Sequence, residues 1–180
     1  MRLRELTMDP VTFEVLRHRM WQITKEMGVA LTRVTGSPSS IDAKDYAAGL
    51  FQADGDLMMI NCGVLFHAVT IPHGIKHIIK EYTDNPGIYD GDVFIINDPY
   101  ICSVHAPDVY VVAPIFCQGK LVGWAGTMTH IVDTGGMDPG VSPRATEVFQ
   151  EGFRFPGLKI AERGEIKKDV WNAVLNLVRD

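Results

Sequence analysis

The chain has 180 residues, of which 46% are hydrophobic and 22% charged, and its formal net charge is −5. This composition is typical of a globular protein with ample apolar residues for a core, and we expect residues 1–180 to form a single domain. The acidic balance argues against a nucleic-acid partner. No apolar run approaches the roughly 18 residues that a membrane helix needs, so no membrane partner is expected. Residues 1–10 are basic but lack the apolar core of a signal peptide, so the predicted location is cytoplasmic.

The first predicted element is a helix that runs from about residue 9 to about residue 34. Asp9 suits the N-cap, where its side chain accepts hydrogen bonds from free N–H groups, and Pro10 suits the first helical position. Apolar residues then recur at intervals of three and four, which predicts one apolar stripe. They are Phe13, Leu16, Met20, Ile23, Met27 and Leu31. The Gly/Ser/Pro segment 36–40 is expected to end the helix.

Short strands and a second helix are predicted next. Residues 46–52 and 57–61 have strand patterns, and the Asp-Gly between them supplies a tight turn. A helix is expected over residues 72–82, with its isoleucines facing inward. Residues 93–96 form a short apolar run that is typical of a buried strand.

A hairpin is predicted after a loop, from strands at 109–116 and 121–128 around Gln118-Gly119. Pro114 cannot donate a ladder hydrogen bond, so the first of these strands is expected to lie at an edge or to carry a bulge. Beyond a Gly/Pro loop, a short helix capped by Thr146, an extended segment at 153–160 and a final helix at 166–179 complete the chain. The predicted fold is α+β, with antiparallel β-hairpins and helices packed on one side.

Chemically active side chains gather at the open end of this hairpin. Asp108 lies just before the first strand and His130 just after the second, and His105 is three residues upstream. A two-residue turn would place Asp108 opposite Thr129. A three-residue loop, or one bulge near Pro114, would place it opposite His130, with Cβ atoms about 4.5–5.5 Å apart. Two imidazoles and one carboxylate that leave coordination positions open suit Mn, Fe or Zn.

Two of these residues also have a structural interpretation, in which Asp108 caps a turn and His130 bonds a strand end. His73 and His77 have the i, i+4 spacing of helical zinc sites. No Glu follows His73 in the HExxH manner, however, and a solvated surface is the favoured interpretation. His67 either faces the hairpin site or is a buried, hydrogen-bonded histidine.

Other polar and sulfur side chains have simpler interpretations. Asp98, at the end of a buried strand, is expected to fold the following loop by bonding its own backbone. Cys62, Cys102 and Cys117 are odd in number and lack CxxC spacing, which predicts reduced, mostly buried thiols.

Several segments together resemble the N-terminal part of the hydantoinase B/oxoprolinase family, which includes the large metal-bearing subunits of acetone and acetophenone carboxylases. The segments are DPVTFEVLRHRM, SPSSIDAKDYAAGLFQADGDL, GDVFIINDPYICSVHAPDVYVVAPIF, GKLVGWAGTMTHIVDTGGMDPG and ATEVFQEGFRFPGLKI. The resemblance extends from Asp9 to Arg179, and its specific motifs are NDPY…H-x-P-D followed by TH…D-x-GG. This sequence departs from the family at Cys102-Ser103-Val104, where small residues are usual, and at Thr129-His130, where many members have His-His.

The resemblance implies a component of a two-part, ATP-dependent enzyme. A partner subunit of the hydantoinase A type, an ATPase, would phosphorylate an amide or enol oxygen of a small-molecule substrate. The B-type subunit would then handle the activated intermediate, by ring opening with water or by carbon–carbon bond formation. Because B-type chains are much longer, this chain is expected to be their N-terminal portion and to need the remaining part of the subunit as a partner.

The resemblance also implies site residues. His105, Asp108 and His130 match the ligands of a divalent metal, which would be Mn, Zn or Fe. Asp45 matches an acidic position before a strand; it is either a further ligand or general base, or an ordinary acid at a strand start. Asp45 and His67 are the candidate catalytic residues.

Three functions follow as hypotheses. The leading one is a subunit for metal-assisted hydrolysis of an ATP-activated cyclic amide. The second is a ketone carboxylase subunit that uses the same ion to stabilise an enolate. The third is a non-catalytic assembly subunit that keeps the fold and pairs with another chain.

Overall fold

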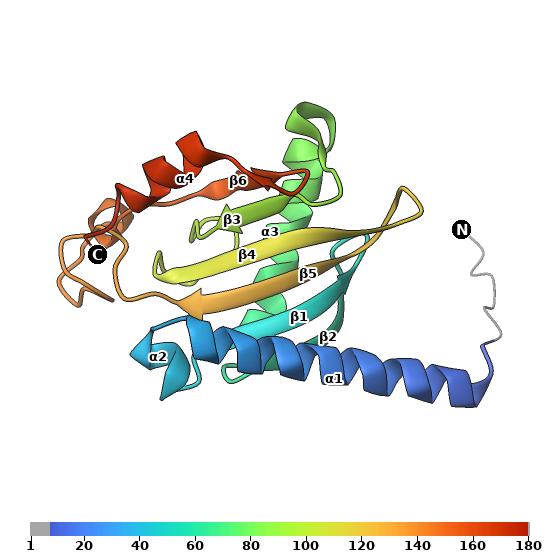
Figure 1. Ribbon diagram of the computed structural model, residues 1–180. Helices are drawn as coiled ribbons and strands as arrows, with labels where there is room; N and C mark the ends of the chain where they lie inside the picture. The colour runs from blue at the N-terminus through green and yellow to red at the C-terminus, as the bar shows by residue number, and fades with distance from the viewer. Residues whose placement is uncertain (1–7, 180) are drawn as a thin grey trace.

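One antiparallel sheet of seven strands organises the chain (Figure 1), and its strand order is β2-β1-β5-β4-β3-β6-β7. The computed structural model describes residues 8–179; most of the basic N-terminal segment and Asp180 lie outside this range. The strands are β1 (Tyr46–Gln52), β2 (Leu57–Cys62), β3 (Val93–Ile96), β4 (Asp108–Cys117), β5 (Lys120–His130), β6 (Pro156–Glu162) and β7 (Glu165–Ile166). The α-helices are α1 (Pro10–Val34), α2 (Pro38–Ile41), α3 (His67–Tyr82) and α4 (Lys168–Leu175), with a π-helical turn at Thr83–Gly87 and a 3-10 turn at Val148–Glu151.

The β4–β5 hairpin carries the register on which the site depends. Its turn has two residues, Gln118 with φ 51° and Gly119 with φ 75°, as a tight turn with two left-handed residues requires. A bulge lies at the step from Ile115 to Phe116, where Val122 of β5 has no opposite residue. The single extra residue places Asp108 directly opposite His130, so the predicted bulge register is confirmed.

Pro114 sits beside this bulge in an interior strand, because β4 pairs with both β5 and β3. The pairing with β3 reaches only as far as Val112. Pro114 therefore lies beyond the paired part of that edge, where the missing N–H removes no ladder hydrogen bond.

A hydrophobic core lies between α3 and one face of the sheet. Ile71, Ile75 and Ile78 of α3 are fully buried, and they pack with buried residues of the strands and the following loop. Those residues are Ala47, Phe51, Phe94, Ile96, Cys102, Tyr110, Val112, Trp124 and Met128. The helix begins at His67, five residues before the predicted start, and Pro72 lies inside it. No side chain caps its first turn, so the sequence carries no start signal at the true position.

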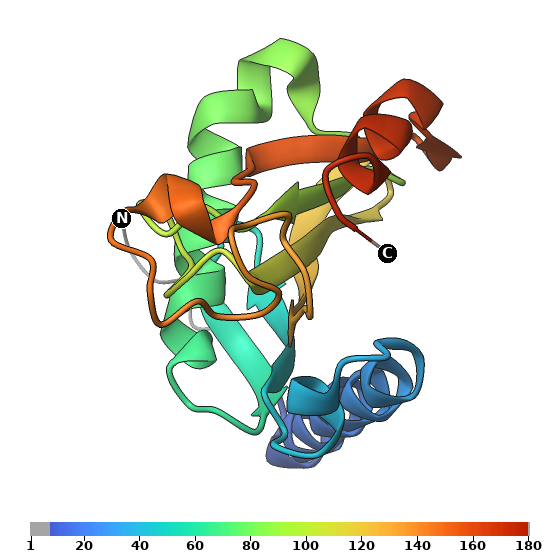
Figure 2. The same ribbon diagram turned by 90° about the vertical axis from the view of Figure 1, so that its left-hand side faces the viewer.

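Helix α1 lies on the opposite face of the sheet, over β1 and β2 (Figure 2). It approaches closely at Gly28, where an added Cβ would lie 2.9 Å from the Tyr46 ring. Tyr46 and Phe51 are five residues apart in a strand whose register with β5 is unbroken, so their side chains point to opposite faces. The α+β class with antiparallel hairpins is confirmed, but the helices divide between both faces instead of packing on one side.

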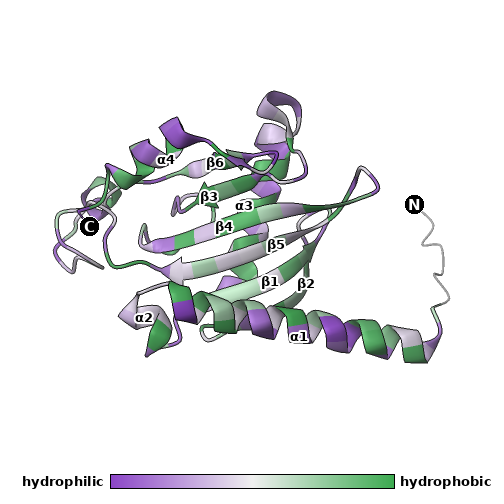
Figure 3. Cartoon of the chain, viewed as in Figure 1, coloured by the Kyte–Doolittle hydropathy of each residue, from purple (hydrophilic) through white to green (hydrophobic). Residues whose placement is uncertain are grey.

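The apolar stripe of α1 is only partly covered. Of its residues only Thr24 and Gly28 are buried, whereas Phe13 and Ile23 are 54% and 45% exposed. The N-cap Asp9 does accept bonds from two backbone N–H groups, as predicted. Figure 3 shows apolar turns along the whole helix, including the end that runs past the sheet in Figure 1. Periodicity correctly predicted the helix but not which of its turns pack against the sheet.

The C-terminal part differs from the predictions in detail. The expected short helix is a 3-10 turn whose N-cap is Glu147, not Thr146. The final helix begins at Lys168, after the two-residue strand β7, and ends at Leu175, four residues before the predicted end. Within the described residues, no helix combines the length and apolar character that a membrane crossing requires.

The three cysteines are free thiols, but only Cys102 is buried; Cys62 is half-buried and Cys117 is exposed. The prediction that they are mostly buried is therefore wrong. Cys117 is exposed because it is the last residue of β4, next to the hairpin turn.

Candidate metal centre

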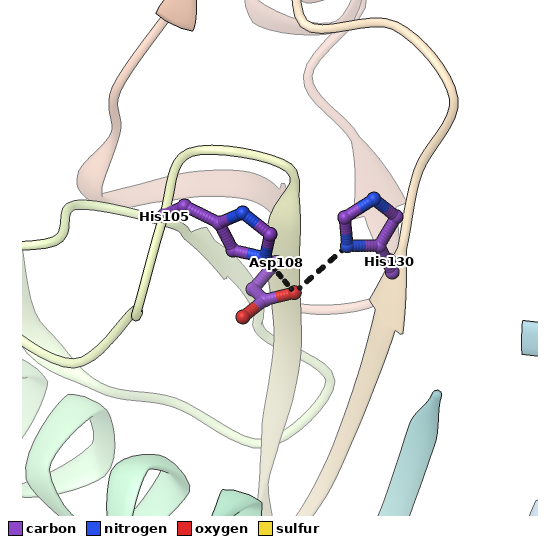
Figure 4. A group of neighbouring side chains, drawn as sticks. All are labelled: His105, Asp108 and His130. Carbon is purple, nitrogen blue, oxygen red and sulfur yellow. Dashed lines mark hydrogen bonds and ion pairs between the residues drawn. The ribbon is translucent and has the colours of Figure 1, made fainter. Parts of the chain in front are cut away.

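The hairpin register brings three predicted ligands together at the open end of β4 and β5 (Figure 4). Asp108 begins β4, and His130, its direct partner, ends β5. His105 Nε2 lies 3.0 Å and His130 Nδ1 lies 3.2 Å from the same oxygen, Asp108 Oδ1. The two imidazole centroids are 4.9 Å apart. The carboxylate thus stands between two nitrogen donors.

Asp45 and His67 join the same cluster from two other elements. Asp45 precedes β1, whose pairing with β5 places Tyr46 opposite Thr129. Asp45 Oδ2 lies 3.7 Å from His130 Nδ1, and Asp45 Oδ1 lies 3.0 Å from Nε2 of His67, the first residue of α3. All five residues predicted for the site therefore converge.

The cluster contains two overlapping groups with metal-ligand spacing. Donor atoms of His105, Asp108 and His130 all lie within 4.8 Å of one another, and so do donor atoms of Asp45, His67 and Asp108. Asp108 belongs to both groups. It is fully buried, and its Oδ2 has no hydrogen-bond partner among the described residues. Buried polar atoms are nearly always paired, so a carboxylate that contacts two imidazoles through one oxygen and leaves the other unpaired fits the donor set of a cation site.

Electrostatics favour a charged centre. Burial alone would raise the pKa of Asp108, but hydrogen bonds with His105 and His130 outweigh it and lower that pKa below the usual value. The bond with Asp108 in turn raises the pKa of His105 against the opposing effect of burial. Asp108 is therefore an anion at neutral pH, as a metal ligand must be.

A set of polar residues that sequence reasoning missed holds the His105 loop in place. Asn97, which is fully buried, donates to the carbonyls of Ala106 and Phe153 at 2.7 and 3.0 Å. Ser103 Oγ donates to the Asp108 carbonyl at 2.9 Å. The sequence signal for this role is Asn97, an asparagine at the end of a buried strand and directly before Asp98-Pro99.

The predicted role of Asp98 in this loop is confirmed, because its Oδ1 accepts from the Tyr100 N–H at 2.9 Å. Ion pairing adds to it, since Arg154 lies 3.5 Å from the same oxygen. His73 is exposed and His77 half-buried, and neither belongs to the two metal-type groups in the described chain. The surface interpretation of His73 is confirmed.

Thr129, one of the two expected departures from the resembled family, points away from the cluster. Its hydroxyl lies 2.7 Å from the hydroxyls of Thr35 and Ser40, on the opposite face of β5 from His130. Ser40 Oγ also donates to the Asp45 carbonyl at 2.8 Å. The departure at position 129 therefore leaves the five-residue cluster intact.

Fold and site together define an α+β domain with a buried histidine–carboxylate cluster at the open end of a hairpin. Comparison with known proteins agrees: the chain belongs to the hydantoinase B/oxoprolinase family, whose model matches residues 9–180. It is similar to the acetophenone carboxylase delta subunit of Aromatoleum aromaticum, with 36% identity over 90% of this chain and 23% of that subunit.

Two solved structures share the fold. A nucleotide-free acetone carboxylase superposes with a TM-score of 0.88 and 28% identity over 95% of this chain and 23% of its own. The ATP-dependent caprolactamase of Pseudomonas jessenii superposes with a TM-score of 0.86 and 29% identity, over 97% of this chain and 30% of its own. The chain thus spans less than a third of the length of these relatives.

Proposed function

We propose that this chain is the metal-bearing domain of an enzyme subunit that works with an ATP-using partner on a small-molecule substrate. The convergence of His105, Asp108 and His130 around one buried carboxylate carries this proposal. The unpaired Oδ2 of Asp108 supports it, because burying a carboxylate oxygen without a partner has a cost that a bound cation would offset. The donor set of imidazole nitrogens and carboxylate oxygens suits Zn, Mn or Fe.

The reaction that we propose first is hydrolysis of a cyclic amide that the partner has activated with ATP. A divalent ion held by the three residues would polarise a carbonyl and lower the pKa of a bound water. Asp45, about a quarter exposed, is placed to accept a proton or to serve as a further ligand. His67, which is fully buried, contacts Asp45 Oδ1 through its Nε2 at 3.0 Å. The similarity to a caprolactamase supports this reaction, since a caprolactam is a cyclic amide.

Ketone carboxylation is the second candidate, and the 36% identity with an acetophenone carboxylase subunit favours it. The two reactions differ in their co-substrate. With a hydantoinase A-type partner and the remaining part of a B-type subunit supplied, ATP turnover that depends on bicarbonate indicates carboxylation. Turnover on a cyclic amide without bicarbonate indicates hydrolysis.

Metal analysis of the purified chain tests the proposal directly. We expect about one divalent ion per chain in the wild type and near-zero metal in Asp108→Ala. Asp56→Ala is the matched control, because Asp56 is an exposed acid paired with Lys76 outside the cluster, and it should keep the metal. Equal, near-zero metal in wild type and Asp108→Ala after metal supplementation would refute the metal proposal and favour a non-catalytic assembly subunit.

A further inference from the structure

Of the three predicted metal ligands, His105 is the one that lies outside a strand. Asp108 and His130 belong to the β4–β5 ladder, where they face each other. His105 lies in the loop that precedes β4. The direction of its imidazole therefore depends on the contacts that fix the backbone of this loop.

Side chains from other segments fix the peptide groups on both sides of Ala106, the residue after His105. The Ala106 N–H belongs to the peptide bond with His105, and it donates to Glu151 Oε2 at 3.1 Å. The Ala106 carbonyl accepts from Asn97 at 2.7 Å. A charged acceptor strengthens the first of these bonds, and Ala106 is fully buried. Because rotation of this peptide would turn the backbone that carries the imidazole, Glu151 restricts the direction of His105.

Glu151 also bonds the segment that follows His130. Thr134, four residues after His130 and almost fully buried, donates its hydroxyl to the Glu151 carbonyl at 2.5 Å. The Thr134 carbonyl accepts from the Phe153 N–H at 2.9 Å, so this segment is held through its side chain and its backbone. With its carboxylate and its carbonyl, Glu151 thus joins the chain beside one imidazole to the chain beside the other.

We propose that Glu151 is a positioning residue of the metal centre, which sets how His105 approaches His130 by bonding the chain beside each of them. The Ile131 N–H donates to the Pro107 carbonyl at 2.9 Å and joins the same two loops through backbone alone, so Glu151 supplies the part that a substitution can remove. Loss of a hydrogen-bonded partner behind a metal ligand typically costs 10–100-fold in metal affinity or activity. The effect on metal rests on the proposed function, whereas the hydrogen bonds do not.

Two substitutions of Glu151 separate positioning from a general structural role. Glu151→Ala removes the acceptor for the Ala106 N–H and keeps the backbone carbonyl that bonds Thr134. Glu151→Gln keeps an acceptor oxygen on a side chain of nearly the same shape, so it should restore the wild-type behaviour. Glu147→Ala is the matched control, because the Glu147 side chain caps the same 3-10 turn. Its loss loosens that turn without removing the acceptor at Ala106.

Three measurements follow these variants. We expect the dissociation constant for Zn²⁺ to rise about 10-fold in Glu151→Ala and to stay near the wild-type value in Glu151→Gln and Glu147→Ala. The visible absorption of bound Co²⁺, which depends on the number and geometry of its ligands, should change in Glu151→Ala alone. Amide hydrogen exchange at Ala106, followed by NMR in the metal-free protein, should be faster in Glu151→Ala alone.

Equal affinities for Zn²⁺ in wild type and Glu151→Ala would overturn the positioning role. An equal loss of affinity in Glu151→Ala and Glu147→Ala would also overturn it, because a loosened turn would then explain both. Equal losses in Glu151→Ala and Glu151→Gln would show that the hydrogen bond is not what matters. Unchanged exchange at Ala106 in Glu151→Ala would remove the contact on which the proposal rests. If the wild type binds no metal, the proposed function fails, and exchange at Ala106 alone decides whether Glu151 holds the His105 loop.

Discussion

Replacing Asp108 with asparagine keeps the shape of the side chain and removes its charge, which tests the metal centre through stability. In the metal-free protein, Asp108 Oδ1 interacts with two imidazoles at 3.0 and 3.2 Å. Asparagine keeps one acceptor oxygen but loses the charge that strengthens these bonds, each worth about 1.5–3 kcal/mol. Removal of a fully buried charge offsets part of this loss. We expect the metal-free variant to be less stable by about 1–2 kcal/mol.

The effect of a bound ion on stability is larger than the effect of the substitution in the metal-free protein, and the ion stabilises the folded state. A ligand at 100 times its dissociation constant stabilises the folded state by about 2.7 kcal/mol. For a domain of this size, that corresponds to a rise in Tm of roughly 5–10 °C. The wild type should show this rise with Zn²⁺ or Mn²⁺, and Asp108→Asn should show almost none.

Thermal unfolding of metal-stripped protein, with and without added ion and followed by circular dichroism, measures both effects. Asp56→Asn is the control, because it removes an exposed acid that pairs with Lys76 and should keep the full metal-dependent rise. An equal rise in wild type and Asp108→Asn would mean that the ion binds elsewhere, and the reasoning about this centre would be refuted.

Three further predictions concern the scaffold. Gly28→Ala should destabilise the fold by about 1–3 kcal/mol in urea unfolding, because the new Cβ meets an aromatic ring at 2.9 Å; an unchanged midpoint contradicts this packing. Burial acts to raise the pKa of Asp133, but the Arg179 and Gly135 N–H groups and the Arg179 side chain outweigh it and lower that pKa. Asp133 therefore stabilises the fold fully above the pKa of about 3.9 that it has in the unfolded chain, and this stabilisation is lost as the pH falls through its lower folded pKa. Asp133→Asn should lose this part of the acid sensitivity of unfolding. Identical plots of stability against pH for wild type and variant would disprove it. Iodoacetamide should label exposed Cys117 rapidly and leave Cys102 unlabelled until unfolding, since burial raises the pKa of Cys102 to about 12; mass spectrometry showing equal rates would be the contrary result.

Local rules made the hairpin predictable and limited its register to two possibilities. The strands and the turn at Gln118-Gly119 follow from alternation and from the need for left-handed residues. Counting residues from that turn left two registers open, and the structure contains the bulge that one of them required. Because the positions of His105, Asp108 and His130 depend only on this register and a short loop, local sequence was sufficient to predict that they lie near one another, and the bulge decides which residue faces Asp108.

Features that depend on distant segments were not predictable in the same way. The six-residue stripe of α1 has helical periodicity, but periodicity carries no information on which turns the sheet covers. The contact between Tyr110 and Thr70 joins a strand to a helix 40 residues away. The first turn of α3 forms without a capping side chain, and Pro72, which resembles a helix start, lies inside the helix.

The unpaired Val122 divides the β4–β5 hairpin into two parts, one next to the turn and one next to the cluster, whose registers differ by one residue. Next to the turn, Cys117 pairs with Lys120 and Phe116 with Leu121. From Ile115–Gly123 to Asp108–His130, every partner on β5 lies one residue further along the chain than this register would give. Excision of Val122 would leave an unbroken ladder in which the same two ligands still face each other. The part of the hairpin next to the turn can therefore lose or gain one residue if the bulge is lost or formed at the same time. Asp108 then still lies opposite His130.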